Sequence, residues 1–468
     1  MEIIGRDDQK AELDNMLLSN KSEFVAVYGR RRVGKTFLIR EYLFNNTVFH
    51  LTGIANVNTT TQLSNFHKTF LKYHSSKVPQ SEPKDWFDAF EILVELVNKS
   101  KIKRKVIFID ELPWLDTPKS NFVAALEHFW NSWAGARKDI VLVVCGSAAS
   151  WMINKLINNR GGLHNRVTSH IKLEPFSLKE CEAFFKYKNI IFSRYQIVEI
   201  YMCFGGIPYY LDLINKGKST AQIINDICFA PNGKLKNEFI NLYASLFKNK
   251  DNYIKIVETL AAKNIGLSRE DIIKYSKLSN GGGTTRILNE LEESGFIRRY
   301  SGFGKASRNS LYQLSDFFSM FYLKFMKKAS HTDTRFWINN ADSTAYRTWA
   351  GFAFEKVCIY HAEQIKAALG IGAVQTQTYA WQTKGAQIDL VMDRRDGIIN
   401  LFEIKFSINT FLIDKKYDAI LRNKTGMFKQ VTNTKKAVHL VMITTFGVVS
   451  NTYSNGLQNN ITLNELFR

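Results

Sequence analysis

The sequence predicts an α/β protein of several domains, and three observations support this. The chain has 468 residues, enough for about two to four domains of ordinary size. Its hydrophobic fraction of 45% and charged fraction of 23% are typical of globular protein. Short apolar strands alternate with helical patterns in the first third, which indicates a parallel sheet with helices on both faces. We expect four domains, with boundaries at 1–165, 166–233, 234–330 and 331–468.

Composition and charge exclude several classes of protein. No run of about 18 apolar residues occurs and the chain starts with a polar segment, so we expect no membrane span, no signal peptide and a cytoplasmic location. The five cysteines contain no CxxC pair and are expected to be reduced and buried. The net charge of +20 favours a polyanionic partner such as nucleic acid. The basic excess is densest in residues 234–330, with 17 basic against 9 acidic residues.

A phosphate-binding loop follows the first expected strand, residues 23–28. The string GRRRVGKT has the spacing GxxxxGK[ST] between a strand and an apolar-periodic helix. In this pattern the glycines let backbone N–H groups wrap a phosphate, Lys35 reaches the terminal phosphates, and Thr36 offers a hydroxyl to Mg²⁺. The residues expected to bind ATP in this loop are Gly29, Arg32, Gly34, Lys35, Thr36 and Phe37.

Two further strands are expected to end in polar residues that complete a hydrolytic site. The strand 106–109 runs into Asp110 and Glu111, where Asp110 would orient Mg²⁺ and Glu111 would polarise the attacking water. The strand 140–145 is followed by Ser147, which is expected to sense the γ-phosphate or, alternatively, to cap the helix after it. ATP hydrolysis, and not only ATP binding, is therefore expected.

The segment after these strands is expected to complete the ATP site from outside the sheet. Arg160 and Arg166 lie in a glycine-containing stretch that would bring a guanidinium to the γ-phosphate, in the same subunit or in a neighbour, so a homo-oligomer is left open. Residues 177–228 read as helices interrupted at 205–208, which predicts a small helical lid.

These motifs resemble a known family. The strings GRRRVGKT, FIDELPWL, CGS and GGIPYYL, in this order and spacing, are similar to the archaeal-type ATPase branch of the STAND class, which is related to the AAA+ ATPases. The resemblance covers roughly residues 1–230. It implies that the turn containing Gly206 and Pro208 approaches the adenine base.

The middle segment predicts a winged helix-turn-helix. Helical faces are expected over 252–263, after the capping sequence at 268–271, and from Thr284 to Gly295, and two strands with a basic tip should follow. Such a unit would place Thr284, Thr285 and Arg286 in the major groove of DNA, with basic wing residues on phosphates. The alternative is a rigid lever that packs on the ATPase. The wing residues concerned are Arg298, Arg299, Lys305 and Arg308.

The last third carries acidic residues and a lysine in a pattern that suits phosphodiester cleavage. Asp389 and Glu403 are expected on adjacent strands of a hairpin, where they would share one Mg²⁺. Lys405 would face the same side as Glu403 and lower the pKa of the attacking water. Glu355, on the preceding helix, would supply another metal ligand.

This pattern resembles the PD-(D/E)xK nuclease superfamily, which implies a restriction-endonuclease-like α/β domain at 331–468. The functional prediction is an ATPase that gates a metal-dependent DNA nuclease, with ATP and Mg²⁺ as cofactors and DNA rather than RNA as the expected nucleic-acid partner. The alternative is an ATP-switched regulator that binds DNA or a protein partner through a catalytically inactive nuclease fold.

Overall fold

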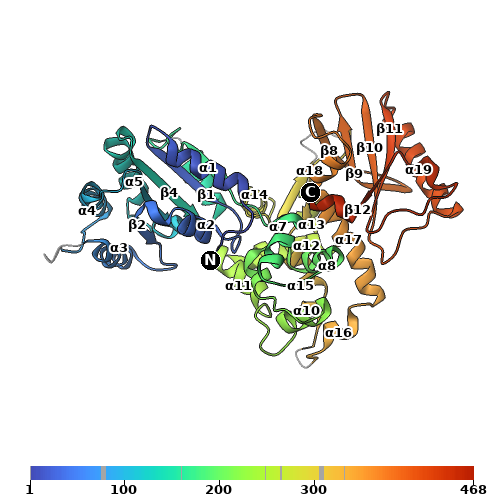
Figure 1. Ribbon diagram of the computed structural model, residues 1–468, viewed down its shortest axis with the longest axis horizontal. Helices are drawn as coiled ribbons and strands as arrows, with labels where there is room; N and C mark the ends of the chain where they lie inside the picture. The colour runs from blue at the N-terminus through green and yellow to red at the C-terminus, as the bar shows by residue number, and fades with distance from the viewer. Residues whose placement is uncertain are drawn as a thin grey trace. The chain divides into compact units, whose positions relative to one another are not determined.

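The computed structural model forms two compact units, Met1–Pro175 and Phe176–Arg468. Each unit has its own five-stranded sheet and its own core (Figure 1). The residues that the structure describes are 2–74, 81–159, 161–247, 249–263, 266–304, 310–330 and 333–468.

The first unit is built on a five-stranded sheet in the order β2-β3-β4-β1-β5, and all its strand pairs are parallel. The central strands β1, β3 and β4 are apolar along nearly their whole length, as expected for a sheet buried on both faces. The bounds are β1 Glu23–Tyr28, β2 Thr47–Thr52, β3 Lys105–Asp110, β4 Ile140–Gly146 and β5 Ser169–Lys172.

Helices cover both faces of this sheet (Figure 1). One face packs on α3, α4 and α5 through an aromatic-rich core that includes Phe24, Phe49, Trp86 and Phe122. Figure 1 shows α1 and α2 on the other face. The helix bounds are α1 Asp7–Leu18, α2 Lys35–Tyr42, α3 Thr59–Tyr73, α4 Trp86–Lys99, α5 Phe122–Ser132, α6 Ala149–Trp151 and a π-helix Met152–Ile157.

The sequence predicted three of the five strands. The strands β2 and β5 were not predicted, because β2 carries His50 and two threonines and only Ile171 is buried in β5. Since β5 pairs with β1 in the core sheet, the structure extends this sheet beyond the expected boundary at residue 165. The compact unit ends at Pro175.

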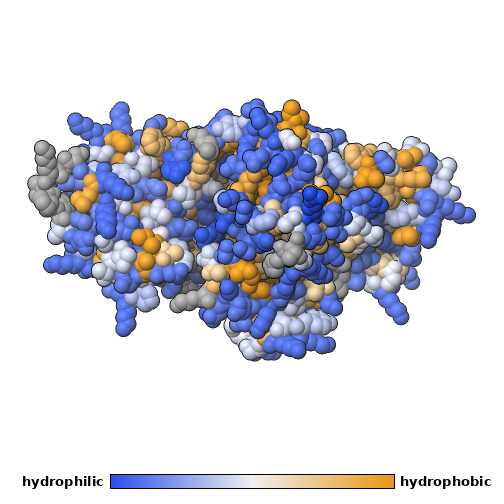
Figure 2. All heavy atoms as spheres, turned by 90° about the horizontal axis from the view of Figure 1, so that it is seen from below, coloured by the Kyte–Doolittle hydropathy of each residue, from blue (hydrophilic) through white to orange (hydrophobic). Residues whose placement is uncertain are grey.

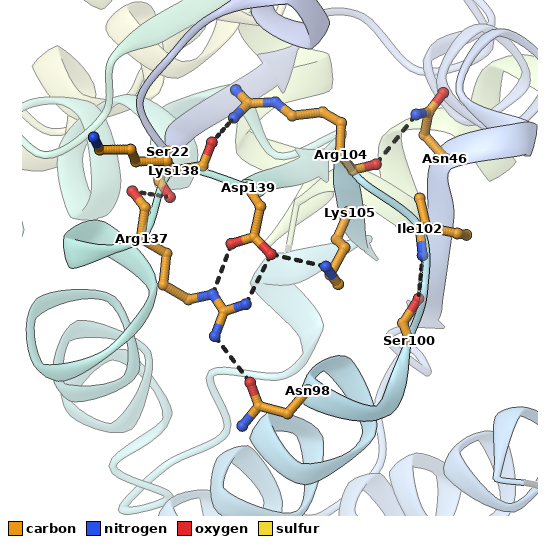
Figure 3. Close-up of polar contacts among 10 residues, drawn as sticks. All are labelled: Ser22, Asn46, Asn98, Ser100, Ile102, Arg104, Lys105, Arg137, Lys138 and Asp139. Carbon is orange, nitrogen blue, oxygen red and sulfur yellow. Dashed lines mark hydrogen bonds and ion pairs between the residues drawn. The ribbon is translucent and has the colours of Figure 1, made fainter.

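The amino ends of strands β3 and β4 are tied together by paired charges (Figure 3). The carboxylate of Asp139 accepts from Arg137 at 2.7 Å and from Lys105 at 2.8 Å. The Arg137 guanidinium is the main reason that the pKa of Asp139 lies well below its usual range. Arg104 donates to the carbonyls of Lys138 and Met16. The amino ends of β3 and β4 are therefore held together by side-chain contacts within the first unit.

The second unit begins with helices, as predicted for the lid. They are packed around buried aromatic and sulfur-containing side chains, and α7, α8 and α10 each start at a serine capping box. The bounds are α7 Leu178–Tyr187, α8 Arg194–Phe204, α9 Pro208–Asp212, α10 Thr220–Cys228 and α11 Glu238–Leu246.

Three helices and an antiparallel hairpin follow, in the order predicted for a winged helix. Ser268 forms the predicted capping box with Asp271. The aromatic helix after the hairpin buries Phe317, Phe318 and Phe321. The assignment to the winged-helix class itself stays a prediction. The bounds are α12 Lys250–Ala261, α13 Arg269–Ser276, α14 Gly282–Glu293, β6 Ile297–Tyr300, β7 Leu311–Leu314 and α15 Phe317–Lys324.

The chain ends in a mixed sheet of the order β12-β11-β10-β9-β8. The pairs β8/β9 and β9/β10 are antiparallel, and β10/β11 and β11/β12 are parallel. In Figure 1, α19 lies on one side of this sheet and α17 on the other. The bounds are α16 Phe336–Asn340, α17 Thr344–Tyr360, α18 Ala362–Ala368, β8 Thr376–Thr383, β9 Ala386–Arg394, β10 Ile398–Lys405, α19 Lys415–Thr432, β11 Ala437–Thr444 and β12 Asn459–Thr462.

The surface and the cysteines agree with the composition. On the face that Figure 2 shows, hydrophilic residues predominate and hydrophobic ones form small separate groups. No helix among the described residues is long and apolar enough to cross a bilayer. None of the five cysteines forms a disulfide, and all five are buried, as predicted.

Candidate active sites

The predicted phosphate-binding loop joins β1 to α2 with a backbone that few residues tolerate. Gly29 has φ 142°, and a Cβ atom there would lie 2.3 Å from the carbonyl oxygen of Leu173. Arg32 also has a positive φ, 72°. Gly34 is the N-cap of α2, and no side chain accepts from the first amides of this helix. The N–H groups at Lys35, Thr36 and Phe37 therefore have no capping side chain, and such a helix start suits an anion.

Lys35 lies at the centre of this loop. It is buried, and its Nζ donates to the carbonyls of Gly29 and Arg30, both at 2.9 Å. Among the described residues it forms no ion pair. Burial is the main cause that lowers its pKa, opposed by the nearby Cys145, Glu111 and Asp110. The loop itself thus holds the ammonium group in place without neutralising it.

The strand end at β3 brings Asp110 to the same place. Its Oδ2 accepts from the hydroxyl of Thr36 at 2.8 Å, so the hydroxyl and the carboxylate predicted to orient Mg²⁺ are in direct contact. Burial is the largest influence on Asp110 and raises its pKa, against hydrogen bonds from Thr36 and Cys145 that lower it. These adjacent oxygen ligands fit a hard divalent cation.

Glu111 is held in an unusual conformation beside Ser147. Its φ is 49°, in the left-handed region that non-glycine residues seldom occupy. The Ser147 hydroxyl reaches both of its carboxylate oxygens, at 3.0 and 3.2 Å. Because α6 has Ala148 as its N-cap and no capping side chain, Ser147 is not a helix cap. The alternative interpretation of Ser147 was therefore wrong.

Sequence reasoning missed Arg6, which supports the loop from the start of α1. Its guanidinium donates to the carbonyls of Val33 and Glu174, at 3.1 and 2.7 Å, and so connects the phosphate-binding loop to the end of β5. A lone arginine near the N-terminus gives no sequence signal for this role. Only the fold brings these segments together.

Comparisons with known proteins fit this geometry. Residues 5–214 match the model of a family described as an ATPase domain predominantly from Archaea. This part of the chain is an archaeal-type ATPase domain.

The similarity to individual proteins is distant but extends over long stretches. An uncharacterized protein of Methanocaldococcus jannaschii is 26% identical over 399 residues, covering 83% of each chain. A Walker-type ATPase of Pyrococcus abyssi has a TM-score of 0.51 at 16% identity, over 69% of this chain and 96% of that chain, which shows a shared fold. The Aeropyrum pernix ORC2 protein, in ADPNP–ADP complexes, has a TM-score of 0.41 at 15% identity, over 69% of this chain and 93% of that chain.

The remaining residues predicted for the ATPase site are less constrained by the structure. Arg166 is exposed on the first unit, and its role stays a prediction. Arg160 lies outside the described residues. Gly206 and Pro208 belong to the second unit, where a Cβ at Gly206 would lie 1.9 Å from the Phe176 carbonyl oxygen and Pro208 begins α9. This turn has a structural reason for its glycine, and its predicted contact with adenine stays a prediction.

In the second unit, Asp389 and Glu403 lie on neighbouring antiparallel strands, as expected. The paired register of β9 and β10 ends at Leu390 opposite Phe402, one residue before Asp389 and Glu403 would face each other. The pairing of β8 with β9 slips in this region, since Tyr379 pairs with Val391 but Trp381 pairs with Ile388. The irregularity therefore falls beside Asp389. Bulges of this kind often redirect a side chain next to a functional site.

Glu403 is the most firmly held of the predicted acidic residues. It is buried, and its Oε1 accepts from the Tyr417 hydroxyl at 2.5 Å and lies 3.1 Å from Lys405 Nζ. Its Oε2 accepts from Lys424 at 2.7 Å. Burial alone would raise its pKa, but Lys405 and Lys424 outweigh burial and hold the pKa below its usual range. Tyr417 and Lys424 come from α19, and neither was predicted.

Glu355 and Asp389 are placed differently. The carboxylate of Asp389 accepts from the Gln387 amide at 2.6 Å. Burial, followed by the charge of Asp389, raises the pKa of Glu355 to about 8. No cluster of three or more histidine, cysteine or acidic side chains in the described parts of the chain is arranged to hold a metal ion. The metal-ligand roles of Glu355, Asp389 and Glu403 stay predictions.

The hairpin of the predicted winged helix does not present all its basic residues outward. Arg298 donates to Gln313 Oε1 at 3.0 and 2.7 Å and stacks on Tyr300 at 4.6 Å. Thr284, expected in the DNA groove, is buried and donates to the Ser279 carbonyl. Lys305 and Arg308 lie outside the described residues.

Proposed function

We propose that the protein binds and hydrolyses ATP at the end of the parallel sheet and that the nucleotide state controls a metal-dependent DNA nuclease in the C-terminal part. The observation that carries the first half is the contact between Thr36 and Asp110 beside a lysine that no carboxylate neutralises among the described residues. The archaeal-type ATPase domain over residues 5–214 supports this half.

Each residue of the loop would have a distinct task. The amides at the start of α2 and the Lys35 ammonium group would hold the phosphates. Thr36 and Asp110 would hold Mg²⁺, which neutralises phosphate charge when bound. Glu111 would accept a proton from the attacking water, and Ser147, now bonded to that carboxylate, would report whether the γ-phosphate is present. Arg166 is proposed to complete the site.

The nuclease half is supported by the arrangement of β9, β10 and α17. Asp389 and Glu403 lie on adjacent strands, Lys405 is 3.1 Å from Glu403, and the pKa of Glu355 responds to the charges of all three. A metal ion would supply the charge that attack on a phosphodiester requires. In the described residues the three carboxylates do not form a metal-holding group, and both oxygens of Glu403 are taken by α19. We therefore propose that cleavage requires Glu403 to be released from Lys424 and Tyr417.

The second candidate function is an ATP-switched regulator that binds DNA or a protein partner without cleaving. The observation that favours it is the same set of contacts on Glu403, because a carboxylate held by two lysines and a tyrosine is fully used by the protein. In this case the C-terminal sheet would be a binding platform.

The test uses the purified full chain with supercoiled plasmid DNA, ATP or a non-hydrolysable analogue, and Mg²⁺ or Mn²⁺. Lys35→Ala should abolish ATP hydrolysis and alter the nucleotide dependence of nicking, whereas Glu403→Ala should abolish nicking and leave ATP hydrolysis intact. If the wild-type chain hydrolyses ATP but nicks DNA under no combination of metal and nucleotide, the nuclease half is wrong and the regulator is favoured.

A further inference from the structure

Two cavities adjoin within the second unit, on either side of Glu355 and Lys356. The first, here called the hairpin cavity, has a volume of ≈ 710 Å³ and lies between the β6–β7 hairpin and strands β8 and β9. The second, here called the lysine cavity, has a volume of ≈ 620 Å³ and lies among α12, α15 and α17. Gln313, Glu355 and Lys356 line both cavities. The two therefore meet at the helix that carries a predicted acidic residue of the nuclease site.

The described lining of the two cavities is strongly basic, with seven lysines and arginines against three carboxylates. Such an excess favours a polyanion. In the lysine cavity, Lys327 pairs with Glu258 at 2.5 Å, but Lys324 and Lys328 are exposed and have no ion pair among the residues that the structure describes. The basic lining residues are Lys263, Arg298, Lys324, Lys327, Lys328, Lys356 and Lys384.

Lys356 is the most unusual of these cations. It is half-buried and faces both cavities, yet within the described parts of the chain its ammonium group has no hydrogen bond or ion pair. Arg298 lies close enough for its positive charge to act on that of Lys356. A poorly solvated cation beside a second one is unfavourable unless an anion joins them. Arg298 is the neighbour, and its side chain is already oriented by Gln313.

The hairpin cavity also offers aromatic surface. Tyr300 and Phe303 line it and are partly exposed, whereas Trp381, which also lines it, is buried in the core of the sheet. A basic groove with aromatic rings is the arrangement that holds single-stranded nucleic acid, because bases stack on rings and phosphates meet cations. Volumes of ≈ 710 and ≈ 620 Å³ lie within the range of roughly 300–1,000 Å³ typical of sites for one small ligand. This size suits successive nucleotides of one strand.

We infer that the hairpin cavity and the lysine cavity together form a path for a single nucleic-acid strand, in which Arg298 and Lys356 hold a phosphate next to Glu355 and Asp389. This inference rests on the proposed nucleic-acid role of the C-terminal part and names its substrate class. The β6–β7 hairpin and the C-terminal sheet then form one binding site. Arg298 would bind a phosphate within the hairpin cavity, and not a phosphate of a duplex that lies on the protein surface.

The test measures binding without cleavage, in EDTA and without nucleotide, by fluorescence anisotropy of the full chain. The probes are a labelled single-stranded DNA of about 20 nucleotides, an RNA of the same sequence, and the corresponding DNA duplex. The single strand is longer than the ~4–16 nucleotides that one single-strand-binding OB fold covers. Three double variants each remove two positive charges: Arg298→Gln with Lys356→Gln, Lys324→Gln with Lys328→Gln, and Lys216→Gln with Lys234→Gln. The last pair is the control, because both lysines are exposed on the second unit and line neither cavity.

The two cavity variants should bind the single strand about tenfold more weakly than wild type. The slope of log K against log salt should become shallower by about 0.7 for each phosphate that the variant no longer binds. The control pair should bind as wild type, and the duplex should bind less tightly than the single strand. Arg298→Lys should restore part of the affinity, which separates a charge effect from a folding effect. The DNA and RNA arms decide which strand the path prefers.

Equal weakening by all three variants, or wild-type binding by both cavity variants, would overturn the inference. If the Arg298 and Lys356 variant unfolds, the exposed Lys324 and Lys328 pair still decides. A chain that never nicks DNA but shows the expected weakening of binding would refute the nuclease and keep the strand path. If the chain nicks DNA while the cavity variants bind the single strand as wild type does, the strand path is refuted and the nuclease is kept.

Discussion

The two candidate sites use the same residue types, but they pair their charges in opposite ways. In the ATPase domain, Lys35 is held by two backbone carbonyls, and its acidic neighbours are bonded to the hydroxyls of Thr36 and Ser147. In the C-terminal sheet, Lys405 and Lys424 contact the carboxylate of Glu403 directly.

This difference indicates how readily each site can bind a charged ligand. Backbone carbonyls and hydroxyls position the charges of the first site without cancelling them, so a phosphate and a cation find both signs available. At Glu403 the lysines already neutralise the carboxylate, and a metal ion would have to compete with them. The charged groups of the first site are available to a ligand, whereas the carboxylate of Glu403 in the second site is already occupied by Lys405, Lys424 and Tyr417.

The largest expected effect is that of Lys35→Ala, which removes the only described ammonium group bonded within the loop. We expect ATP hydrolysis to fall by at least about 100-fold, since the variant has no charge there to meet the phosphates. Lys105→Ala is the matched control. Lys105 lies at the amino end of β3, away from the phosphate-binding loop, and pairs with Asp139. The substitution should lower thermal stability and leave the specific ATPase activity of the folded protein near wild type, as a phosphate-release assay would show. Equal loss of activity in both variants would contradict the assignment.

Glu111→Gln should separate hydrolysis from binding. The variant keeps the shape of the side chain but cannot accept a proton, so hydrolysis should slow by about 100-fold while ATP affinity changes little. Ser147→Ala removes only one hydrogen bond to Glu111 and should slow hydrolysis by roughly 3–10-fold. Single-turnover hydrolysis and equilibrium binding of a fluorescent ATP analogue measure the two quantities. Loss of binding in Glu111→Gln would mean that this residue shapes the loop instead.

At the C-terminal site, Lys424→Gln should ease metal binding. Because Lys424 occupies Oε2 of Glu403, its removal should lower the Mg²⁺ or Mn²⁺ concentration needed for half-maximal nicking by about tenfold, the scale on which neighbours of metal ligands act. Lys429→Gln, at an exposed position of the same helix, is the control. If Lys424→Gln abolishes nicking at every metal concentration, this lysine belongs to the working site and does not restrain it.

The last prediction is a pH dependence of stability in the second unit. His361 accepts from the Leu178 N–H at 3.0 Å, and burial, only partly offset by the Val357 carbonyl, lowers its pKa to about 4. A histidine with a depressed folded pKa stabilises above its unfolded pKa of about 6.5, and this stability, at most ~3 kcal/mol, is lost as pH falls toward 4. Protection factors from hydrogen exchange, which correct for the intrinsic pH dependence of the exchange rate, should be lower in α7 at pH 5 than at pH 7, and His361→Gln should remove this difference. Equal wild-type protection factors at the two pH values would refute the prediction.

The predictions from sequence were most accurate where a short pattern fixes its own geometry. The strands β1, β3 and β4 are apolar runs buried on both faces, and their polar ends lie at one edge of the sheet because parallel strands share direction. The strand β10 places Glu403 and Lys405 on one face because side chains alternate. Strands such as β5, with one buried residue, leave no such pattern.

The sequence by itself therefore determined which residues carry the chemistry: the loop ending in Lys35 and Thr36, the acidic pair after β3, and the acidic residues and lysine of the last sheet. Only the tertiary structure decided their partners. Three contacts join residues that are far apart in the sequence: Arg6 with the phosphate-binding loop, Lys424 with Glu403, and Arg298 with Lys356. Local periodicity cannot encode such contacts, because they depend on which faces the packed helices and strands turn toward one another.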